Sequence, residues 1–327
     1  MTFPFTRMRR LRRTPALREL VAETWLRPAQ LVYPMFVTNG SPTPTPVASM
    51  PGVFQQPLEA IEADVEDVLS LGVSTVLLFG VPDEKDTEGT AAWDEAGVIQ
   101  QAVRRLKDRF GDDLTVMTDT CLCEYMTHGH CGITLGGSVL NDPSVELLGR
   151  VAVSQAEAGA DVVAPSAMMD GQVAYIREVL DEAGYDHVPI MAYSAKYSSS
   201  LYAPFRDAAE SAPAVGNRSS YQMDYRNRRE ALRELVLDVG ECADLVMVKP
   251  ALFYMDVIRE ARALTELPLV AYSVSGEFSM LKAAAEKGWL DEEAVLMEYL
   301  FGLRRAGADA IITYAAKEAA RWLNRQG

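Results

Sequence analysis

Residues 243–250 read ADLVMVKP, a short apolar run that ends in a lysine and a proline. Apolar residues at consecutive positions are typical of a strand buried on both faces, as in a parallel sheet covered by helices. Seven further segments have the same character, and each is bounded by turn or helix signals. They are residues 31–37, 73–80, 114–122, 161–167, 189–196, 268–275 and 308–315.

Segments with the apolar spacing of amphipathic helices lie between these predicted strands. They include residues 58–71, 98–110, 145–158, 173–183, 228–241 and 255–265. The phrase Ala-Gly-Ala-Asp occurs at 158–161 and at 306–309, where the glycine fits the end of a helix that leads into the next strand. Eight strand–helix units predict an α/β fold, a (β/α)8 TIM barrel. An open doubly wound sheet is the alternative, but this sequence lacks the glycine-rich phosphate turn that usually follows its first strand.

Composition and charge narrow the class of protein. The 327 residues include 31 Lys+Arg and 46 Asp+Glu, a formal net charge of −15, and 49% are hydrophobic. This acidity argues against a nucleic-acid partner, because phosphate neutralisation needs clustered Lys and Arg. No apolar run reaches the roughly 18–20 residues of a membrane span, and the first residues lack the hydrophobic stretch of a secretory signal. We therefore expect a soluble, cytoplasmic protein with no membrane partner.

The N-terminus has the opposite charge to the rest of the chain. It carries five arginines in a few residues, namely Arg7, Arg9, Arg10, Arg12 and Arg13. We predict that residues 1–30 form an arm that docks on an acidic neighbouring subunit, and that residues 31–327 form the barrel. A solvated basic tail is the alternative interpretation.

Two connections between predicted strands and helices are long. Residues 39–57 and 197–225 both exceed the roughly 15 residues that are usual for a loop inside a compact domain. The second contains Arg206, Arg218 and Gln222. Cationic residues in a long loop that leaves a barrel strand predict a lid over an anionic ligand. A surface insertion without function is the alternative.

The segment DTCLCEYMTHGHCG holds three of the four cysteines. Cys121 and Cys123 can share one face of an extended segment, and Cys131 returns after a turn that contains glycine. Thiolates are soft ligands and favour zinc. His128 or His130 could supply a fourth ligand. If neither does, three thiolates leave one position open for water or a substrate oxygen. Buried cysteines without a metal are the alternative.

Two lysines end predicted strands. Lys249 ends the apolar part of 243–250, and Lys196 ends 189–196. A lysine that faces the mouth of a barrel loses solvation, which lowers its pKa, and a second ammonium group nearby lowers it further. The neutral amine is the form that attacks a carbonyl to make a Schiff base. A lone lysine in such a place more often reaches solvent, but two lysines on adjacent strands near a thiolate cluster favour catalysis.

A barrel brings these groups together, because the C-terminal ends of all eight strands open on one face. Ser275 ends the seventh predicted strand and Tyr314 the eighth. Their hydroxyls, with backbone amides of the helix beyond Gly276, could hold a carboxylate. Arg206 and Arg218 could hold a second carboxylate in bidentate fashion.

Over essentially its whole length the chain resembles the porphobilinogen synthase (5-aminolaevulinate dehydratase) family, a family of lyases. The stretches that carry the resemblance are RMRRLRRTPALR, LVYPMFV, TDTCLCEYMTHGHCG, APSAMMDG, AYSAKYSSSLYAPFRDA, GNRSSYQMDYRNRREALRE, DLVMVKPALFYMD, AYSVSGEF and ITYAAKEAA. The resemblance implies a barrel with an arm, and a homo-octamer built from arm-exchanging dimers. It also implies the condensation of two 5-aminolaevulinate molecules into porphobilinogen, with loss of two waters, in tetrapyrrole and haem synthesis.

The resemblance assigns roles to individual residues. Lys249 is expected to form the Schiff base with the substrate that supplies the propionyl side, and Lys196 to bind the substrate that supplies the acetyl side. Ser275 and Tyr314 are expected to bind the first carboxylate. The residues expected to bind the second are Arg206, Arg218 and Gln222.

The resemblance also bears on metals. Cys121, Cys123 and Cys131 match the zinc-dependent branch, with Asp119 as a polar neighbour of the zinc-bound water or amine. Glu234 matches a site where many bacterial members hold an activating, allosteric magnesium at a subunit boundary, near an arm residue that corresponds to Arg12. One departure is visible, since Ala167 stands where many members carry Asp; this removes an acid–base role there but leaves Asp170 and the lysines untouched.

Two other functions are compatible with parts of this pattern. A class I aldolase or lyase on the same barrel explains Lys249, but neither the three cysteines nor the second lysine. A zinc-binding regulatory or scaffold protein explains the cysteines, and it predicts four-coordinate zinc and no reactive lysine.

Overall fold

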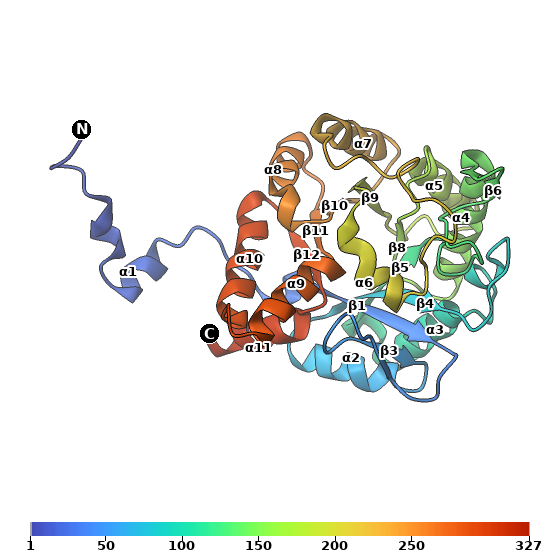
Figure 1. The fold of residues 1–327 in the computed structure, drawn as a ribbon, viewed down its shortest axis with the longest axis horizontal. Coiled ribbons are helices and arrows are strands. Elements are labelled where there is room, and N and C mark those ends of the chain that lie inside the picture. Colours follow the sequence, from blue (N-terminus) through green and yellow to red (C-terminus); the bar gives the residue numbers. More distant parts are fainter. Residues whose placement is uncertain (1, 327) are drawn as a thin grey trace.

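The computed structural model describes residues 2–326, and eight parallel strands form the centre of the molecule (Figure 1). The strands are β1 (Leu31–Thr38), β4 (Thr75–Val81), β5 (Thr115–Thr120), β8 (Val162–Pro165), β9 (Met191–Lys196), β10 (Leu245–Lys249), β11 (Leu269–Ser273) and β12 (Ala310–Thr313). They pair in the order β8-β5-β4-β1-β12-β11-β10-β9. A parallel bridge between Val163 and Ile190 joins β8 toward β9 and nearly closes the ring. The predicted (β/α)8 barrel is confirmed.

Helices cover the outside of this barrel. They are α2 (Ile61–Ser70), α3 (Val98–Phe110), α4 (Asn141–Glu157), α5 (Gln172–Glu182), α7 (Arg228–Gly240), α8 (Met255–Leu264), α9 (Ser275–Glu286), α10 (Glu292–Ala306) and α11 (Ala316–Gln326). The eight predicted strands agree with the structure to within two residues at either end. Helix α4 begins earlier than the predicted 145, because its Pro143 lies in the first turn, where proline is tolerated. Among residues 2–326, no helix is long and apolar enough to cross a bilayer.

Most strand residues are apolar because the strands are buried on both faces. On β4, Leu77 and Phe79 belong to the larger apolar core. The alternate residues Val76 and Leu78 pack in a second core with side chains of α2 and α3, such as Val103. This alternation is the pleat of a strand between two apolar layers. It leaves positions inside the barrel for the side chains of the site.

An aspartate directly precedes three of the later strands and anchors a neighbouring strand. Asp161, Asp244 and Asp309 each accept a hydrogen bond from a backbone N–H at the beginning of the adjacent strand. The donors are Val116, Ile190 and Leu269, at 2.7, 2.8 and 2.9 Å. Two of these aspartates close the Ala-Gly-Ala-Asp phrases, so the phrase ends a helix and also holds two strands in register.

The N-terminal segment runs away from the barrel (Figure 1). It contains η1 (Met8–Arg12), α1 (Pro15–Leu20) and η2 (Pro28–Gln30), and neither η1 nor α1 has a buried residue. Phe3, Phe5 and Leu20 are each at least 74% exposed. The segment first touches the barrel near Trp25, whose carbonyl accepts a hydrogen bond from Arg304 at 3.3 Å.

The two long connections contain short regular elements. Residues 39–57 hold β2 (Thr45–Pro46) and β3 (Phe54–Pro57), and β3 pairs with β1. Residues 197–225 hold η5 (Ser200–Tyr202) and α6 (Ala203–Ala208), and we call this segment the lid. A small hairpin of β6 (Thr134–Leu135) and β7 (Ser138–Val139) follows the cysteine segment. The remaining short helices are η3 (Thr90–Ala92), η4 (Gly111–Asp113) and η6 (Leu252–Tyr254).

Candidate active site

Lys196 and Lys249 lie side by side at the C-terminal ends of β9 and β10, where the two residues are register partners. Both side chains are buried. Their ammonium nitrogens lie 5.4 and 5.0 Å from the centre of the same ring, that of Tyr193. The two lysines therefore share one cavity, as the sequence predicts.

Aromatic rings surround the amine of Lys249. Its Nζ lies 4.0 Å from the centre of the Tyr272 ring. Four further rings lie within 5.9 Å of it, those of Phe79, Tyr193, Tyr202 and Phe205. Desolvation in this cage, with the positive charge of Lys196 nearby, lowers the pKa of Lys249 to about 7. A substantial fraction of this amine is then neutral at physiological pH.

Lys196 has a polar environment. Its ammonium group donates a hydrogen bond to the Ser166 carbonyl, and the Ser166 hydroxyl donates to Asp119 Oδ2 at 3.0 Å. Burial raises the pKa of Asp119 to about 6, against the lowering effect of both lysines. The other oxygen of Asp119, Oδ1, is buried without a hydrogen-bond partner among the residues described. It is therefore available to a bound molecule.

The three cysteines of the predicted metal site converge beside Asp119. The Sγ atoms of Cys121, Cys123 and Cys131 all lie within 4.8 Å of one another, and all three side chains are buried. Hydrogen bonds from the Cys121 and Cys123 thiols lower the pKa of Cys131 well below its ordinary value, whereas burial raises the pKa of Cys121. The cluster thus favours a thiolate at Cys131, and a soft divalent cation would stabilise thiolates at all three positions.

The two histidines of the segment lie outside this cluster. Both ring nitrogens of His130 are engaged, Nδ1 with the Tyr221 hydroxyl at 3.0 Å and Nε2 with the Val215 carbonyl at 2.9 Å. His128 Nδ1 accepts the backbone N–H of His130. The metal-ligand clusters among residues 2–326 include neither histidine. The alternative with three thiolates and an open position therefore fits this structure, and His130 is a contact to the lid.

The lid is fastened to the cysteine segment at several points. Arg218 Nη2 donates to the Gly129 carbonyl at 2.9 Å, and the Ala214 N–H donates to the His128 carbonyl at 3.0 Å. Gly129 has a φ of +67°, and a Cβ atom there would collide with the Ala212 carbonyl oxygen. Only glycine allows this close approach. The arrangement places Arg218 against the cysteines.

The predicted residues for the second carboxylate carry unpartnered polar atoms. Arg218 and Gln222 are buried. Arg206 Nε, Arg218 Nε and both amide atoms of Gln222 have no hydrogen-bond partner among residues 2–326. Burial, followed by the charge of Arg218, lowers the pKa of Arg206. Buried donors without acceptors are costly, so the two guanidinium groups are suited to an anionic ligand, whereas Gln222 lines the same cavity as Glu234.

The predicted residues for the first carboxylate follow β11 and β12. The strand β11 ends at Ser273, so Ser275 begins α9 and does not end the strand as predicted. Its hydroxyl accepts the Phe205 N–H at 2.9 Å and donates to the Leu201 carbonyl at 3.1 Å. Tyr314 follows β12, and its hydroxyl lies 3.1 Å from that of Tyr272. Both residues are buried at the mouth of the barrel.

Sequence reasoning missed one charged residue of the site, Glu124. Its side chain is buried, and its Oε2 lies 3.2 Å from Cys123 Sγ. With Asp119 and Cys121 it forms a second set of potential ligands within 4.8 Å. The available signal was a glutamate directly after Cys-Leu-Cys.

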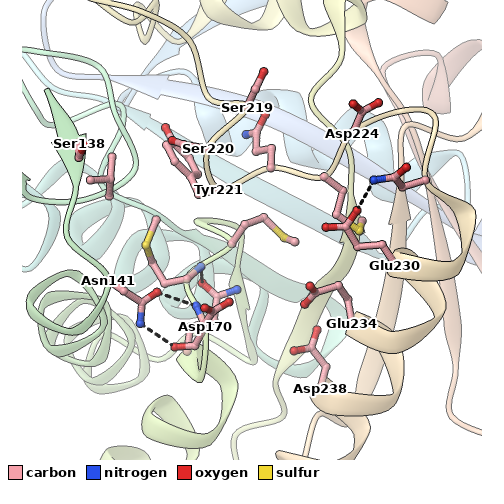
Figure 2. Close-up of a pocket in the computed structure, with 17 residues that line it drawn as sticks. Ser138, Asn141, Asp170, Ser219, Ser220, Tyr221, Asp224, Glu230, Glu234 and Asp238 are labelled. Carbon is pink, nitrogen blue, oxygen red and sulfur yellow. Dashed lines mark hydrogen bonds between the residues drawn. The ribbon is translucent and has the colours of Figure 1, made fainter.

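Glu234 lines an acidic cavity of about 430 Å³ between α7 and the lid (Figure 2). Figure 2 shows Glu234 and Asp238 on α7 facing the same space as Asp170. Burial and the charge of Asp170 raise the pKa of Glu234, and burial raises the pKa of Asp238 to about 7. The prediction named Glu234 alone; four further carboxylates line the same cavity, those of Asp170, Asp224, Glu230 and Asp238. Arg12 is the last residue of η1, in the N-terminal segment that runs away from the barrel (Figure 1).

A family model, relatives of similar sequence and a solved structure all match this chain to the same enzyme family. A family model described as delta-aminolevulinic acid dehydratase matches residues 5–322. Proteins of that name from Halalkalibacterium halodurans and Bacillus subtilis are 55% and 52% identical to this chain over 322 and 323 residues, covering 98% and 99% of both partners. A crystal structure of delta-aminolevulinic acid dehydratase (porphobilinogen synthase) from Toxoplasma gondii, in complex with the reaction product porphobilinogen, matches with a TM-score of 0.95 at 44% identity. That match covers 97% of this chain and 91% of the other.

Proposed function

This chain belongs to the delta-aminolevulinic acid dehydratase family, and from that premise we propose how its own residues carry out the reaction. The chain is a lyase of porphyrin biosynthesis that condenses two 5-aminolevulinate molecules into porphobilinogen with loss of two waters. The family membership and activity predicted from the sequence are confirmed. The aldolase and scaffold alternatives are wrong.

Lys249 is the nucleophile toward the ketone of one substrate. The observation that carries this assignment is its pKa of about 7 inside the aromatic cage. The neutral amine adds to the carbonyl carbon, loss of one water gives an imine, and uptake of one proton from solvent gives the protonated imine. This cation stays over the ring faces of Tyr272 and its neighbours, which favour a positive charge. The protonated imine acidifies the adjacent C–H bonds, which prepares the carbon for bond formation.

Lys196 binds the second substrate. Its hydrogen bond to the Ser166 carbonyl holds the amine near Asp119, whose Oδ1 has no partner within residues 2–326. We assign to Asp119 the orientation of the amino group of a substrate. Two substrates held on register partners of adjacent strands lie close enough to be joined.

Two groups of residues hold the substrate carboxylates. Arg206, Arg218 and Gln222 supply unpartnered polar atoms for the second one. Ser275 and Tyr314 bind the first, and for this the Ser275 hydroxyl must exchange its contacts with the lid residues Leu201 and Phe205. Substrate binding and lid position are coupled at this hydroxyl.

Cys121, Cys123 and Cys131 would hold a zinc ion through three sulfurs. When bound, zinc supplies a Lewis acid that polarises a substrate oxygen or amine. Glu234, Asp170 and Asp238 line one cavity and offer oxygen ligands of the kind that magnesium prefers. The clusters of three potential ligands within 4.8 Å of one another among residues 2–326 do not include these carboxylates. A cytoplasmic location and a homo-octamer formed through the arm remain predictions.

Two experiments test the mechanism. One is incubation with 5-aminolevulinate alone, followed by a colour test for pyrrole, and the other is borohydride trapping of the lysine adduct. We expect pyrrole from the wild-type chain and a reduced adduct on Lys249, located by peptide mass spectrometry. Lys249→Met should abolish both, and exposed Lys287→Met should change neither. An adduct found only at another lysine contradicts the assignment.

Exhaustive chelation tests the metal assignments with the same assay. We expect activity to be lost and zinc to restore it. Cobalt(II) should give a thiolate charge-transfer absorption that weakens in Cys123→Ser. Full activity in metal-free protein contradicts the zinc assignment. A magnesium response that persists in Glu234→Gln contradicts the magnesium site.

A further inference from the structure

Glu277 is a buried carboxylate on α9 that does not touch the lysines, and both of its oxygens are fully engaged. Oε1 accepts the backbone N–H groups of Ala251 and Leu252 at 3.1 and 2.7 Å. Oε2 accepts the Val274 N–H at 2.7 Å and the Tyr299 hydroxyl at 2.9 Å. Burial raises the pKa of Glu277 to about 7, against the lowering effect of these four hydrogen bonds. Above that pH the carboxylate is ionised and can accept all four.

Three of the four donors to Glu277 are backbone N–H groups from two different parts of the site, and the fourth, Tyr299, lies on α10. Ala251 and Leu252 come directly after Lys249 and Pro250, at the exit of β10. Val274 comes directly before Ser275, at the start of α9. One carboxylate thus ties the segment that carries the Schiff-base lysine to the segment that carries a carboxylate-binding hydroxyl.

The start of α9 also contacts the lid. The Ser275 hydroxyl bonds Phe205 and Leu201, and a Cβ atom on Gly276 would lie 2.6 Å from the Leu201 carbonyl oxygen. Phe205 in turn lies 5.2 Å from Lys249 Nζ. A shift of the Glu277 bridge therefore moves the amine and the groups packed around it relative to one another.

A carboxylate is the side chain that this place requires. Four N–H and O–H groups point at two oxygens, so every acceptor position is used and no donor on Glu277 is needed. The amide of glutamine would direct its own N–H groups at one pair of these donors. A cavity lined mainly by apolar side chains, including Leu252, Leu281 and Leu296, borders Glu277, so the lost contacts would be poorly replaced.

We propose that Glu277 is a positioning residue, which fixes Lys249 relative to Ser275 so that the bound ketone meets the amine in a reactive geometry. This inference rests on the proposed Schiff-base role of Lys249. Glu277 acts through the backbone at the end of β10 and does not contact the substrate.

The test compares Glu277→Gln with Tyr299→Phe at pH 8. The second variant removes one hydrogen bond to Oε2 but leaves the Ala251 and Leu252 contacts in place. We expect Glu277→Gln to lower kcat and the rate of borohydride-trapped adduct on Lys249 by about tenfold or more, because small misplacements of reacting groups have such effects. KM should change by less than about threefold, since the carboxylate-binding side chains are intact. The kcat of Tyr299→Phe should stay within about twofold of the wild-type value. The melting temperature of this variant should fall, because it loses one hydrogen bond to Glu277.

Three outcomes overturn the inference. The first is a rate of adduct trapping in Glu277→Gln that equals the wild-type rate. The second is a loss of kcat in Tyr299→Phe as large as in Glu277→Gln. The third is an effect of Glu277→Gln on KM alone. If Glu277→Gln does not fold, Glu277→Asp retains the charge with a shorter reach and should show the same loss of kcat. If the wild-type protein forms no trapped adduct on Lys249, that result contradicts the proposed function and not the role of Glu277. The two failures are therefore distinguishable.

Discussion

Lys249 and Lys196 are neighbours in the barrel, yet their amines have different surroundings. Lys249 faces five aromatic rings, whereas Lys196 donates to a backbone carbonyl next to Asp119. Desolvation favours the neutral form of the first amine. The surroundings of Lys249, and not its residue type, favour the neutral form of its amine at neutral pH.

Replacing Lys196 by Met should raise the pKa of Lys249. The positive charge of Lys196 is the second cause that lowers this pKa to about 7, and its removal makes the protonated form of Lys249 less unfavourable. The neutral fraction at pH 7 then falls, and the pH midpoint of adduct formation moves to higher pH. Borohydride trapping of 4-oxopentanoate on Lys249 across a pH series measures that midpoint, because this keto acid needs only one lysine.

The wild-type midpoint should lie near pH 7, with trapping faster above it than below it. Lys287 lies beside Trp289, outside the site. Lys287→Met is therefore the matched control and should leave the midpoint unchanged. A midpoint that stays in place in Lys196→Met refutes the electrostatic coupling of the two lysines.

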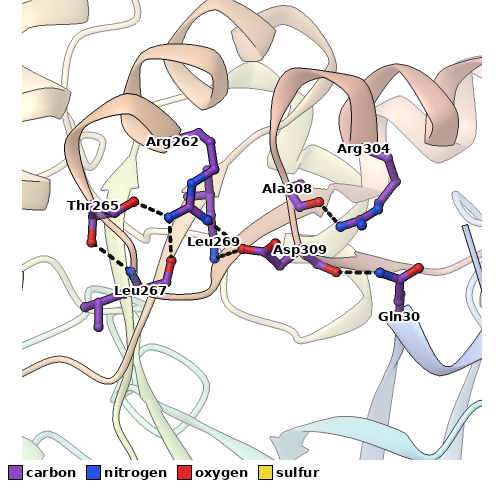
Figure 3. Close-up of polar contacts among 8 residues, drawn as sticks. All are labelled: Gln30, Arg262, Thr265, Leu267, Leu269, Arg304, Ala308 and Asp309. Atoms are coloured by element: carbon purple, nitrogen blue, oxygen red, sulfur yellow. Dashed lines mark hydrogen bonds and ion pairs between the residues drawn. The ribbon is translucent and has the colours of Figure 1, made fainter. Parts of the chain in front are cut away.

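At the scale of elements, the two rims of the barrel have different tasks. The C-terminal ends of the strands carry the lysines, the cysteines and the lid. The opposite rim holds the strands together through aspartates such as Asp309 (Figure 3). Asp309 Oδ2 accepts the Leu269 N–H at 2.9 Å and pairs with Arg262 at 2.7 Å, while its carbonyl accepts from Gln30 at 3.4 Å.

Asp309→Ala should therefore lower stability without changing the chemistry. We expect the free energy of unfolding to fall by about 1–3 kcal/mol, because the Leu269 N–H and Arg262 lose their acceptor. Denaturant unfolding measures this change, and kcat at low temperature should remain that of the wild type. Asp186→Ala, at an exposed aspartate, should have little effect on either quantity. A large loss of kcat at unchanged stability would assign Asp309 to the site instead.

At the scale of the whole molecule, the described part of the arm extends away from the barrel (Figure 1). Its arginines and exposed aromatic residues extend from a chain whose formal net charge is −15. Exposed apolar surface of this kind marks an interaction site, and charge complementarity favours an acidic surface on a second copy of the chain.

Deleting residues 2–25 should reduce the size of the oligomer. The deletion removes η1, α1 and their exposed side chains but leaves η2 and the contact of Gln30 with Asp309. Light scattering coupled to size-exclusion chromatography should give a smaller mass for the truncated chain than for the full chain. Circular dichroism checks that the barrel remains folded. Equal masses for the two proteins contradict the arm's role in assembly.

The sequence by itself determined the barrel, the lysines and the cysteines of the site. Strand segments are visible because burial on both faces demands consecutive apolar residues, which is a local property of the chain. Lys249 and Lys196 are visible because each ends such a segment. The same local logic predicted strand ends to within two residues.

Only the tertiary structure decided what surrounds these groups. The pKa of Lys249 depends on rings from β4, β9, β11 and the lid, and the roles of His130, Glu124 and Glu277 depend on partners far away in the chain. The acidic cavity at Glu234 likewise needs Asp170 from another loop. Desolvation and Coulomb energy depend on distances in space, and sequence spacing does not give those distances.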